Sequence, residues 1–212
     1  MKNRIITSLI ISISLIIFHN EVKSEDFIFE SDFIEFKDNG NIIEAKNGVK
    51  IITKDNVRIT ANQSFYNKLN AKLLLKGNVV FENIEDQIKI FSQEINYKTD
   101  IEKITSKNKT TIHLANDYII DGYGIEYFKE KKIVTSKNKV TLTDNFKNIV
   151  TSTSFKYLIN KKLFEGINII IVDKDMNNYF IERSMVNLNN NKILGKDIEI
   201  NFAKNSFDNT DN

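Results

Sequence analysis

The stretch ITSKNKTTI at residues 104–112 recurs with few changes as VTSKNKVTL at residues 134–142. The pentapeptide TSKNK is identical in both copies, and the copies start 30 residues apart. A fixed period of this length is typical of proteins that stack copies of one supersecondary unit. The stretch therefore predicts a repeat protein.

The same period extends over most of the chain. Six anchor residues follow one another at intervals of 30 or 31 residues, namely Phe36, Tyr66, Tyr97, Tyr127, Tyr157 and Leu188. Seven residues before each anchor stands a large apolar residue, namely Phe29, Ile59, Ile90, Ile120, Val150 and Ile181. Five residues before the anchor stands a small residue in five of the six units, namely Ser31, Ala61, Ser92, Gly122 and Ser152. Six units in register indicate an array of repeats.

Each unit is predicted to form a strand, a turn and a second strand. Alternation of Ile, Val, Phe, Tyr and Thr at period two is typical of half-buried strands. The second strand carries an alternating pair in every unit: Val49/Ile51, Val79/Phe81, Thr110/Ile112, Val140/Leu142, Ile169/Ile171 and Ile198/Ile200. With 7 Gly and no Pro, Asn and Asp are expected to supply the turns.

A bend is expected in every repeat, because the small residue and the next apolar position are three residues apart rather than two. The fold class is therefore all-β: about six two-strand repeats of about 30 residues, stacked into an elongated two-walled structure with inward apolar faces. No helix is expected after the first 24 residues.

Residues 1–24 have the pattern of a secretory signal peptide. Lys2 and Arg4 precede an apolar segment from Ile5 to Phe18, and cleavage is expected between Ser24 and Glu25. An uncleaved membrane anchor is the alternative, but this segment is shorter than the roughly 20 residues that span a bilayer. The pattern predicts export from the cytoplasm.

Composition excludes several functional classes. The chain has no Cys, which removes disulfides, thiolate metal sites and thiol nucleophiles. Its two His and its net charge of +2 favour neither a metal centre nor a nucleic-acid partner. No phosphate-binding Gly loop is present, and no cofactor is expected. A secreted polysaccharide enzyme would need clustered carboxylates, whereas Glu30, Asp32 and Glu35 alternate along one strand and are interpreted as its solvated side. We therefore expect a non-enzymatic protein.

The run from Phe27 to Phe81 resembles the OstA/LptA-like repeat family. The matching pieces are Glu44-Ala45 with Asn47-Gly48-Val49, Ala61 with Tyr66, and Lys76-Gly77-Asn78-Val79. Over residues 25–203 the chain is similar to the N-terminal periplasmic domain of the LptD family. The resemblance implies a folded-over β-jellyroll, or β-taco, in the periplasm or on the periplasmic side of the outer membrane. Its groove would carry the acyl chains of lipopolysaccharide.

The resemblance also implies partners. An LptA-like periplasmic bridge protein would meet the N-terminal edge, and a β-barrel with its lipoprotein plug would lie at the C-terminal side. Residues 204–212 would be a polar tail or linker toward that barrel. Because the barrel itself is not in the sequence, the chain is interpreted as a fragment or a split relative, or alternatively as a stand-alone LptA/LptC-like periplasmic bridge protein.

The candidate lipid-binding residues form an apolar trough. One line is Phe29, Ile59, Ile90, Ile120, Val150 and Ile181, and the alternating pairs, among them Val79, Phe81, Val140 and Leu142, are expected on the facing wall. The small residues beside the line are expected to leave space for a ligand. A closed core uses the same side chains and remains the alternative.

Two lysine clusters, Lys129–Lys132 and Lys161–Lys162, fall in or beside predicted turns. They are interpreted as solvated charges that protect the edges, with contact to anionic phosphates as the alternative. The anchor tyrosines are interpreted as structural.

Overall fold

The computed structural model describes residues 27–114, 118–188, 190 and 192–204. The predicted signal peptide and most of the predicted polar tail lie outside these residues. In the described ranges no helix is long and apolar enough to cross a membrane.

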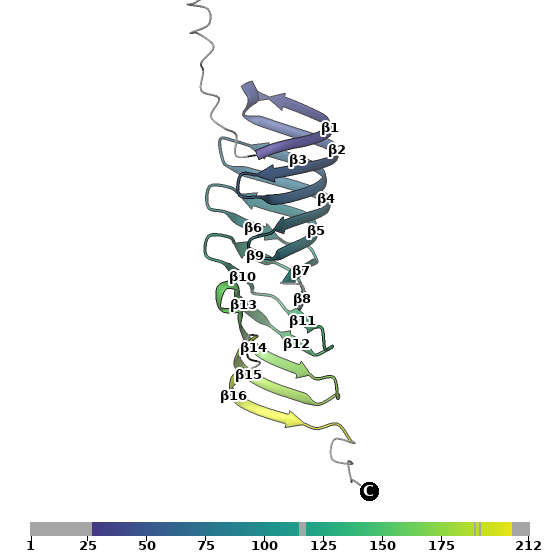
Figure 1. Ribbon diagram of the computed structural model, residues 1–212, viewed down its shortest axis with the longest axis vertical. Coiled ribbons are helices and arrows are strands. Elements are labelled where there is room, and N and C mark those ends of the chain that lie inside the picture. Colours follow the sequence, from purple (N-terminus) through teal and green to yellow (C-terminus); the bar gives the residue numbers. More distant parts are fainter. Residues whose placement is uncertain (1–26, 115–117, 189, 191, 205–212) are drawn as a thin grey trace, which may run out of the picture.

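The described chain folds into sixteen strands of one long, folded-over antiparallel sheet (Figure 1). Their bounds are β1 Phe27–Lys37, β2 Ile42–Thr53, β3 Val57–Asn67, β4 Lys72–Asn83, β5 Ile88–Lys98, β6 Lys103–Ser106, β7 Thr110–Leu114, β8 Tyr118–Gly122, β9 Ile125–Phe128, β10 Ile133–Ser136, β11 Val140–Asp144, β12 Ile149–Ser152, β13 Ser154–Leu158, β14 Leu163–Val172, β15 Asn178–Asn187 and β16 Lys192–Asn201. Two short 3₁₀ turns, η1 (Asp38–Gly40) and η2 (Ile159–Lys161), complete the elements. The predicted elongated, all-β fold is confirmed.

The sixteen strands correspond to the twelve that the repeat predicts. Eight of them, β1 to β5 and β14 to β16, are continuous over 10 to 12 residues. The other four predicted strands lie in the middle of the molecule, and each is interrupted, so that it forms two shorter strands: β6/β7, β8/β9, β10/β11 and β12/β13. The interruptions of β8/β9 and β12/β13 fall where the sequence predicts a bend, after Gly122 and Ser152, whereas the sequence predicts none at the interruptions of β6/β7 and β10/β11.

The interruptions divide the middle of the sheet into two walls. β5 pairs with both β6 and β7, from which one wall continues as β9, β10 and β13 and the other as β8, β11 and β12. Both walls rejoin at β14, which is followed by β15 and β16. We call the wall formed by β6, β9, β10 and β13 the tyrosine wall, and the wall formed by β7, β8, β11 and β12 the isoleucine wall. Each wall also includes the adjoining halves of the continuous strands.

Bulges produce the bend in the continuous strands. Pairing of β1 with β2 shifts between Ser31 and Phe33, and pairing of β2 with β3 shifts between Lys46 and Val49. Asn47 and Gly48, inside the second shift, both have positive φ, a conformation that Gly and Asn tolerate best. The predicted bend beside Ser31 is therefore confirmed as a change of register, while the bend of β2 at Asn47 and Gly48 is one that the sequence analysis does not predict.

The turns lie along two edges of the folded sheet. Among the described turns, the first edge carries the β1–β2, β3–β4, β5–β6, β9–β10 and β13–β14 turns, and the second edge carries the β2–β3, β4–β5, β11–β12 and β14–β15 turns. On the first edge, equivalent residues of successive repeats have positive φ, namely Ala71, Glu102, Lys132 and Lys162. Asn and Asp are thus not the only suppliers of left-handed turns, contrary to the sequence-based expectation.

Main-chain hydrogen bonds connect the first-edge turns to one another. The amide of Thr99 donates to the carbonyl of Ala71 (2.9 Å), and that of Lys129 donates to the carbonyl of Glu102 (3.1 Å). The amide of Ile159 donates in the same way to the carbonyl of Lys132 (3.0 Å). Each left-handed residue therefore turns its carbonyl toward the next repeat, which pairs main-chain polar groups of the turns and connects repeats that are about 30 residues apart.

The hydrophobic core fills the space between the two walls. Along the tyrosine wall the anchors alternate with aliphatic residues of neighbouring strands: Tyr97 pairs with Ile104, Ile104 with Tyr127, and Tyr127 with Val134. Tyr97 and Tyr127 both meet the ring of Phe81 edge-on, at centroid distances of 5.9 and 6.2 Å. These contacts give the anchor tyrosines a packing role.

The small residues of the repeat do not leave empty space, contrary to expectation. A Cβ atom on Gly122 would lie 2.7 Å from Cγ1 of Val140, its cross-strand partner. The hydroxyl of Ser92 lies 2.7 Å from that of Ser106, and both are buried. The small residues are needed because their cross-strand neighbours fill the row beside the bend.

A candidate lipid-binding core and the seam that closes it

All ten candidate lipid-binding residues lie in or against the core. Eight of them are at most 3% exposed, namely Ile59, Ile90, Ile120, Ile181, Val79, Phe81, Val140 and Leu142. Phe29 and Val150 are partly buried and pack against the same cluster. The residues therefore line the interior, where they contact one another as a closed core does.

The expected division of these residues between two facing walls is wrong. Ile51 pairs with Ile59, Ile59 with Phe81, and Phe81 with Ile90, so the candidate line and the alternating pairs share one wall. The row continues along the isoleucine wall through Ile120 and Leu142. The facing row consists of the anchor tyrosines and their aliphatic neighbours, because the bend separates the two halves of each strand.

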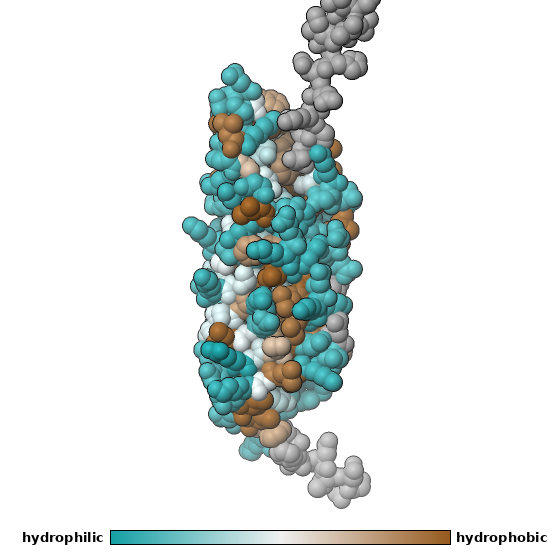
Figure 2. Space-filling model, turned by 90° about the vertical axis from the view of Figure 1, so that its left-hand side faces the viewer, coloured by the Kyte–Doolittle hydropathy of each residue, from teal (hydrophilic) through white to brown (hydrophobic). Residues whose placement is uncertain are grey.

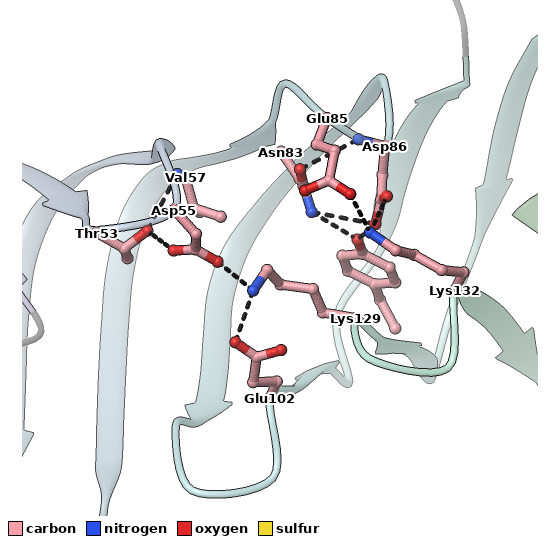
Figure 3. A network of polar contacts seen from close by, with 10 residues as sticks. Thr53, Asp55, Val57, Asn83, Glu85, Asp86, Glu102, Lys129 and Lys132 are labelled. Atoms are coloured by element: carbon pink, nitrogen blue, oxygen red, sulfur yellow. Dashed lines mark hydrogen bonds and ion pairs between the residues drawn. The ribbon is translucent and has the colours of Figure 1, made fainter.

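The two edges of the sheet meet along a line that we call the seam. Lys129, at the start of the β9–β10 turn, crosses it to form an ion pair with Asp55 of the β2–β3 turn (Figure 3). Its ammonium nitrogen also lies 2.6 Å from Oε1 of Glu102 on its own edge. Lys129 is only 8% exposed, so the prediction that this lysine is solvated is wrong.

A second lysine of the same turn crosses the seam one hairpin farther along. The ammonium group of Lys132 lies 2.5 Å from Oδ1 of Asp86 and 3.1 Å from Oε1 of Glu85, both in the β4–β5 turn (Figure 3). The hydroxyl of Tyr127 donates to Asp86 and accepts a hydrogen bond of 2.9 Å from Nδ2 of Asn83. We call Lys129, Lys132 and their four carboxylate partners the latch.

The electrostatics favour the charged forms of Asp55 and Lys129 and the neutral form of Tyr127. Burial opposes ionisation of Asp55, but hydrogen bonds from Lys129 and Thr53 outweigh it, so the pKa of Asp55 lies below its ordinary value. Burial likewise opposes protonation of Lys129, yet Asp55 and Glu102 raise its pKa well above the usual range. Burial, together with the bond to Asp86, also raises the pKa of Tyr127, which stays a neutral donor.

The seam is hollow toward the C-terminal end. A pocket of about 590 Å³ lies there, lined by Tyr118, Leu142, Asp144, Asn145, Phe146, Asn148, Val150, Ile171, Asp173, Tyr179, Val186, Leu188 and Ile193. Two candidate residues, Leu142 and Val150, belong to its lining. Figure 2 shows an apolar patch at this lower end of the molecule.

Sequence reasoning missed the latch and the pocket. The partners of Lys129 and Lys132 lie in turns of distant repeats, and no local motif connects them. Among the described residues, no group of three or more His, Asp or Glu side chains is placed to hold a metal ion. The chemistry that this arrangement offers is burial of hydrocarbon between two apolar rows.

Comparison with known proteins gives one family. The family model described as "Lipopolysaccharide-assembly, LptC-related" matches residues 28–145, more than half of the chain. The matched part begins in β1 and ends just after β11. No curated protein matches the chain.

Among solved structures, one similar chain is LptH of Pseudomonas aeruginosa, described as the LptA homologous periplasmic component of the lipopolysaccharide transport device. The alignment has 8% identity and a TM-score of 0.31, and it covers 71% of this chain and 96% of LptH. At this TM-score the likeness adds no support to a functional assignment.

Proposed function

The chain belongs to the LptC-related family of lipopolysaccharide-assembly proteins, and we propose that it holds the acyl chains of lipopolysaccharide between its two walls and passes the lipid across the periplasm. In this proposal it acts as a bridge-type protein, exported by the signal peptide that the sequence predicts. Membership of an assembly family is consistent with a non-enzymatic role.

The observation that carries the proposal is the continuous apolar interior. The rows of the isoleucine and tyrosine walls extend through successive strands from β1 to β15 without a charged residue among the paired core positions. Exposing an acyl chain to water costs about 0.8 kcal/mol of free energy per CH₂. For a chain of a dozen carbons the cost is on the order of 10 kcal/mol. A carrier therefore needs an apolar path of this continuity.

The family match favours a bridge protein over an LptD-type domain. It names LptC-related proteins, whereas the barrel and lipoprotein plug suggested by the LptD resemblance stay predictions. The residue resemblance to OstA/LptA-like repeats suits either type, since both use the same unit. We therefore adopt the bridge-type alternative as the proposed function.

The two ends of the sheet are the proposed docking edges for other bridge components. Among the strands of the described residues, β1 and β16 each pair with a single neighbour and leave one edge of main-chain groups open. Such an edge accepts a strand from another chain. Every residue of β16 is exposed, and its core-facing Ile193, Ile198 and Ile200 have no further strand over them in the described chain.

Site-specific photo-crosslinking tests lipid binding in the interior. A photo-crosslinking amino acid at Ile90 or Ile120, both buried in the isoleucine wall, is expected to capture lipopolysaccharide in cells. The matched controls are their outward-facing neighbours Lys89, paired with Glu82, and Asp121, which accepts a hydrogen bond from Thr111. Equal capture at all four positions would contradict the proposal.

A further inference from the structure

Packing between the walls loosens toward the C-terminal end of the molecule. Among the described residues, fifteen Leu, Ile, Phe and Tyr side chains are at most 1% exposed; thirteen of them lie between Ile43 and Tyr127, and the other two are Phe164 and Ile169. The latch spans this tightly packed part, since its carboxylates lie between Asp55 and Glu102. Beyond it the seam contains the 590 Å³ pocket.

The floor of this seam pocket is the core itself. Leu142 and Ile171 belong to the buried cluster, and Val150 packs against that cluster. Two other apolar residues of the lining are largely exposed to solvent: Phe146 is 72% exposed and Ile193 is 45% exposed. The apolar side chains of the lining thus range from solvent-exposed positions to the buried core.

We infer that the seam pocket is the port through which an acyl chain of lipopolysaccharide passes between solvent and the core, while the latch keeps the seam closed farther along. The inference rests on the proposed function, and it adds the place of loading. It also divides the seam into a part that opens to lipid and a part that holds the walls together.

The size and chemistry of the pocket select hydrocarbon. Its volume lies within the range of about 300–1,000 Å³ that small-molecule sites occupy, and apolar side chains cover its floor. The carboxylates at its rim, Asp144 and Asp173, repel a phosphate group. Both already accept main-chain hydrogen bonds within their own turns, at 2.8 Å from Asn148 and 2.9 Å from Asn177. The phosphates of the lipid would therefore stay outside while a chain enters.

The rim is also held in place. Asp144 and Asp173 cap two successive second-edge turns with the same pattern, Asp-x-x-x-Asn. The amide of Lys174 donates to Oδ1 of Asn148 (3.1 Å), which joins one turn to the other. This bond fixes the β11–β12 and β14–β15 turns relative to each other, so one side of the mouth of the port is held in place.

Introducing a negative charge at the mouth tests the port. Phe146→Glu and Ile193→Glu place a carboxylate beside the path but alter exposed positions, so the fold is expected to persist by circular dichroism. The matched control is Leu69→Glu, which alters a 74% exposed apolar residue of the β3–β4 turn, outside the pocket lining. We expect both port variants to take up lipopolysaccharide and dansyl undecanoic acid about tenfold more slowly than wild type, with the control unchanged.

A crosslink across the seam at the position of the latch tests whether lipid enters there instead. The chain has no Cys, so Asp55→Cys and Lys129→Cys introduce a single thiol pair across the seam that a short bis-maleimide can join. Uptake of both probes is expected to persist after joining, at the rate of the unjoined double variant. Loss of uptake on joining would overturn the port and place loading at the latched part of the seam.

The outcomes separate the port from the proposed function. If wild-type protein binds lipopolysaccharide but Phe146→Glu and Ile193→Glu load at the wild-type rate, the port is wrong and the proposed function stands. If wild-type protein binds neither probe, both are wrong. Slow loading of the port variants together with uptake by the joined protein supports the port.

Discussion

Lys129 and Asp55 form an ion pair that joins the β9–β10 turn to the β2–β3 turn across the seam. The two turns belong to repeats that are not neighbours in the chain. They meet because strands in a sheet twist, so that opposite edges of the folded sheet approach each other at an offset. A single lysine thus helps to hold the two walls at a fixed separation, which sets the width of the space between them.

Removing the Lys129 charge is expected to weaken the fold. Lys129→Met keeps much of the buried side chain but leaves Asp55 and Glu102 without their shared cation. Because these carboxylates are partly exposed, with side chains 40% and 31% accessible, the expected loss is about 1–3 kcal/mol in the free energy of unfolding. Urea denaturation followed by circular dichroism measures it.

The control for this change is Lys131→Met in the same turn. Lys131 is exposed, and its ammonium group lies 5.5 Å from the centroid of the Phe128 ring, a contact of modest strength at the surface. A loss below about 0.5 kcal/mol is expected for it. Equal losses for the two variants would show that the latch does not stabilise the fold.

Acid is expected to weaken the latch through Asp55. Its folded-state pKa lies below the ordinary value of 3.8, so the unfolded chain binds this proton more readily than the folded one. The stabilisation is complete above the ordinary value and is lost as pH falls through the lower folded-state pKa. The difference in unfolding free energy between wild type and Asp55→Asn should therefore be present at about pH 7 and shrink below about pH 4. A difference that is constant over this range would contradict the assignment.

The strand periodicity could be predicted from the sequence because it is local. The positions of Tyr97, Tyr127 and Tyr157 already indicate the repeat, and all three are buried in the tyrosine wall. Burial raises the pKa of Tyr157 to about 12, as expected for a neutral packing residue. The bend in the first strand of each repeat could be predicted as well, since a spacing of three residues must change the face of a strand.

The arrangement of walls and turns could not be predicted in the same way. Ile59 and Phe81 share a wall because of strand register, which depends on hydrogen bonding between strands rather than on spacing within one. Glu102 adopts positive φ, unfavourable for its type, because its carbonyl thereby meets the amide of Lys129. The latch depends on the twist of the whole sheet, for which the sequence carries no local signal.

The row beside the bend has no room for larger side chains. Gly122→Ala would bring a methyl group to 2.7 Å from Val140, and we expect a loss of about 1–3 kcal/mol in the free energy of unfolding. The double variant Gly122→Ala with Val140→Ala relieves the contact, so its loss should be smaller than the sum of the two single losses. Additive losses, measured by urea denaturation, would show that the close contact is not the cause.

The C-terminal edge is expected to depend on Ile198 for association with other chains. Ile198 pairs with Ile181, lies on the core-facing side of β16 and is 52% exposed. A strand added to β16 would cover it, while a charge at this position would have to be buried without a partner. Ile198→Lys should therefore weaken binding of a bridge-type partner, or self-association if the chain stacks on itself, by about tenfold or more. Analytical ultracentrifugation over a range of concentrations measures self-association, and a pull-down measures partner binding.

The matched control for this edge is Leu194→Lys. Leu194 lies on the same strand, where it pairs with Met185, and is 68% exposed, but it faces the opposite side of β16 from Ile193 and Ile198. Because a stacked strand extends the core on the inner face, Leu194→Lys should leave association nearly unchanged. If both variants associate as wild type does, with unchanged circular dichroism, β16 is not the docking edge. The same experiment would then move to the core-facing Phe36 of β1, which is 64% exposed.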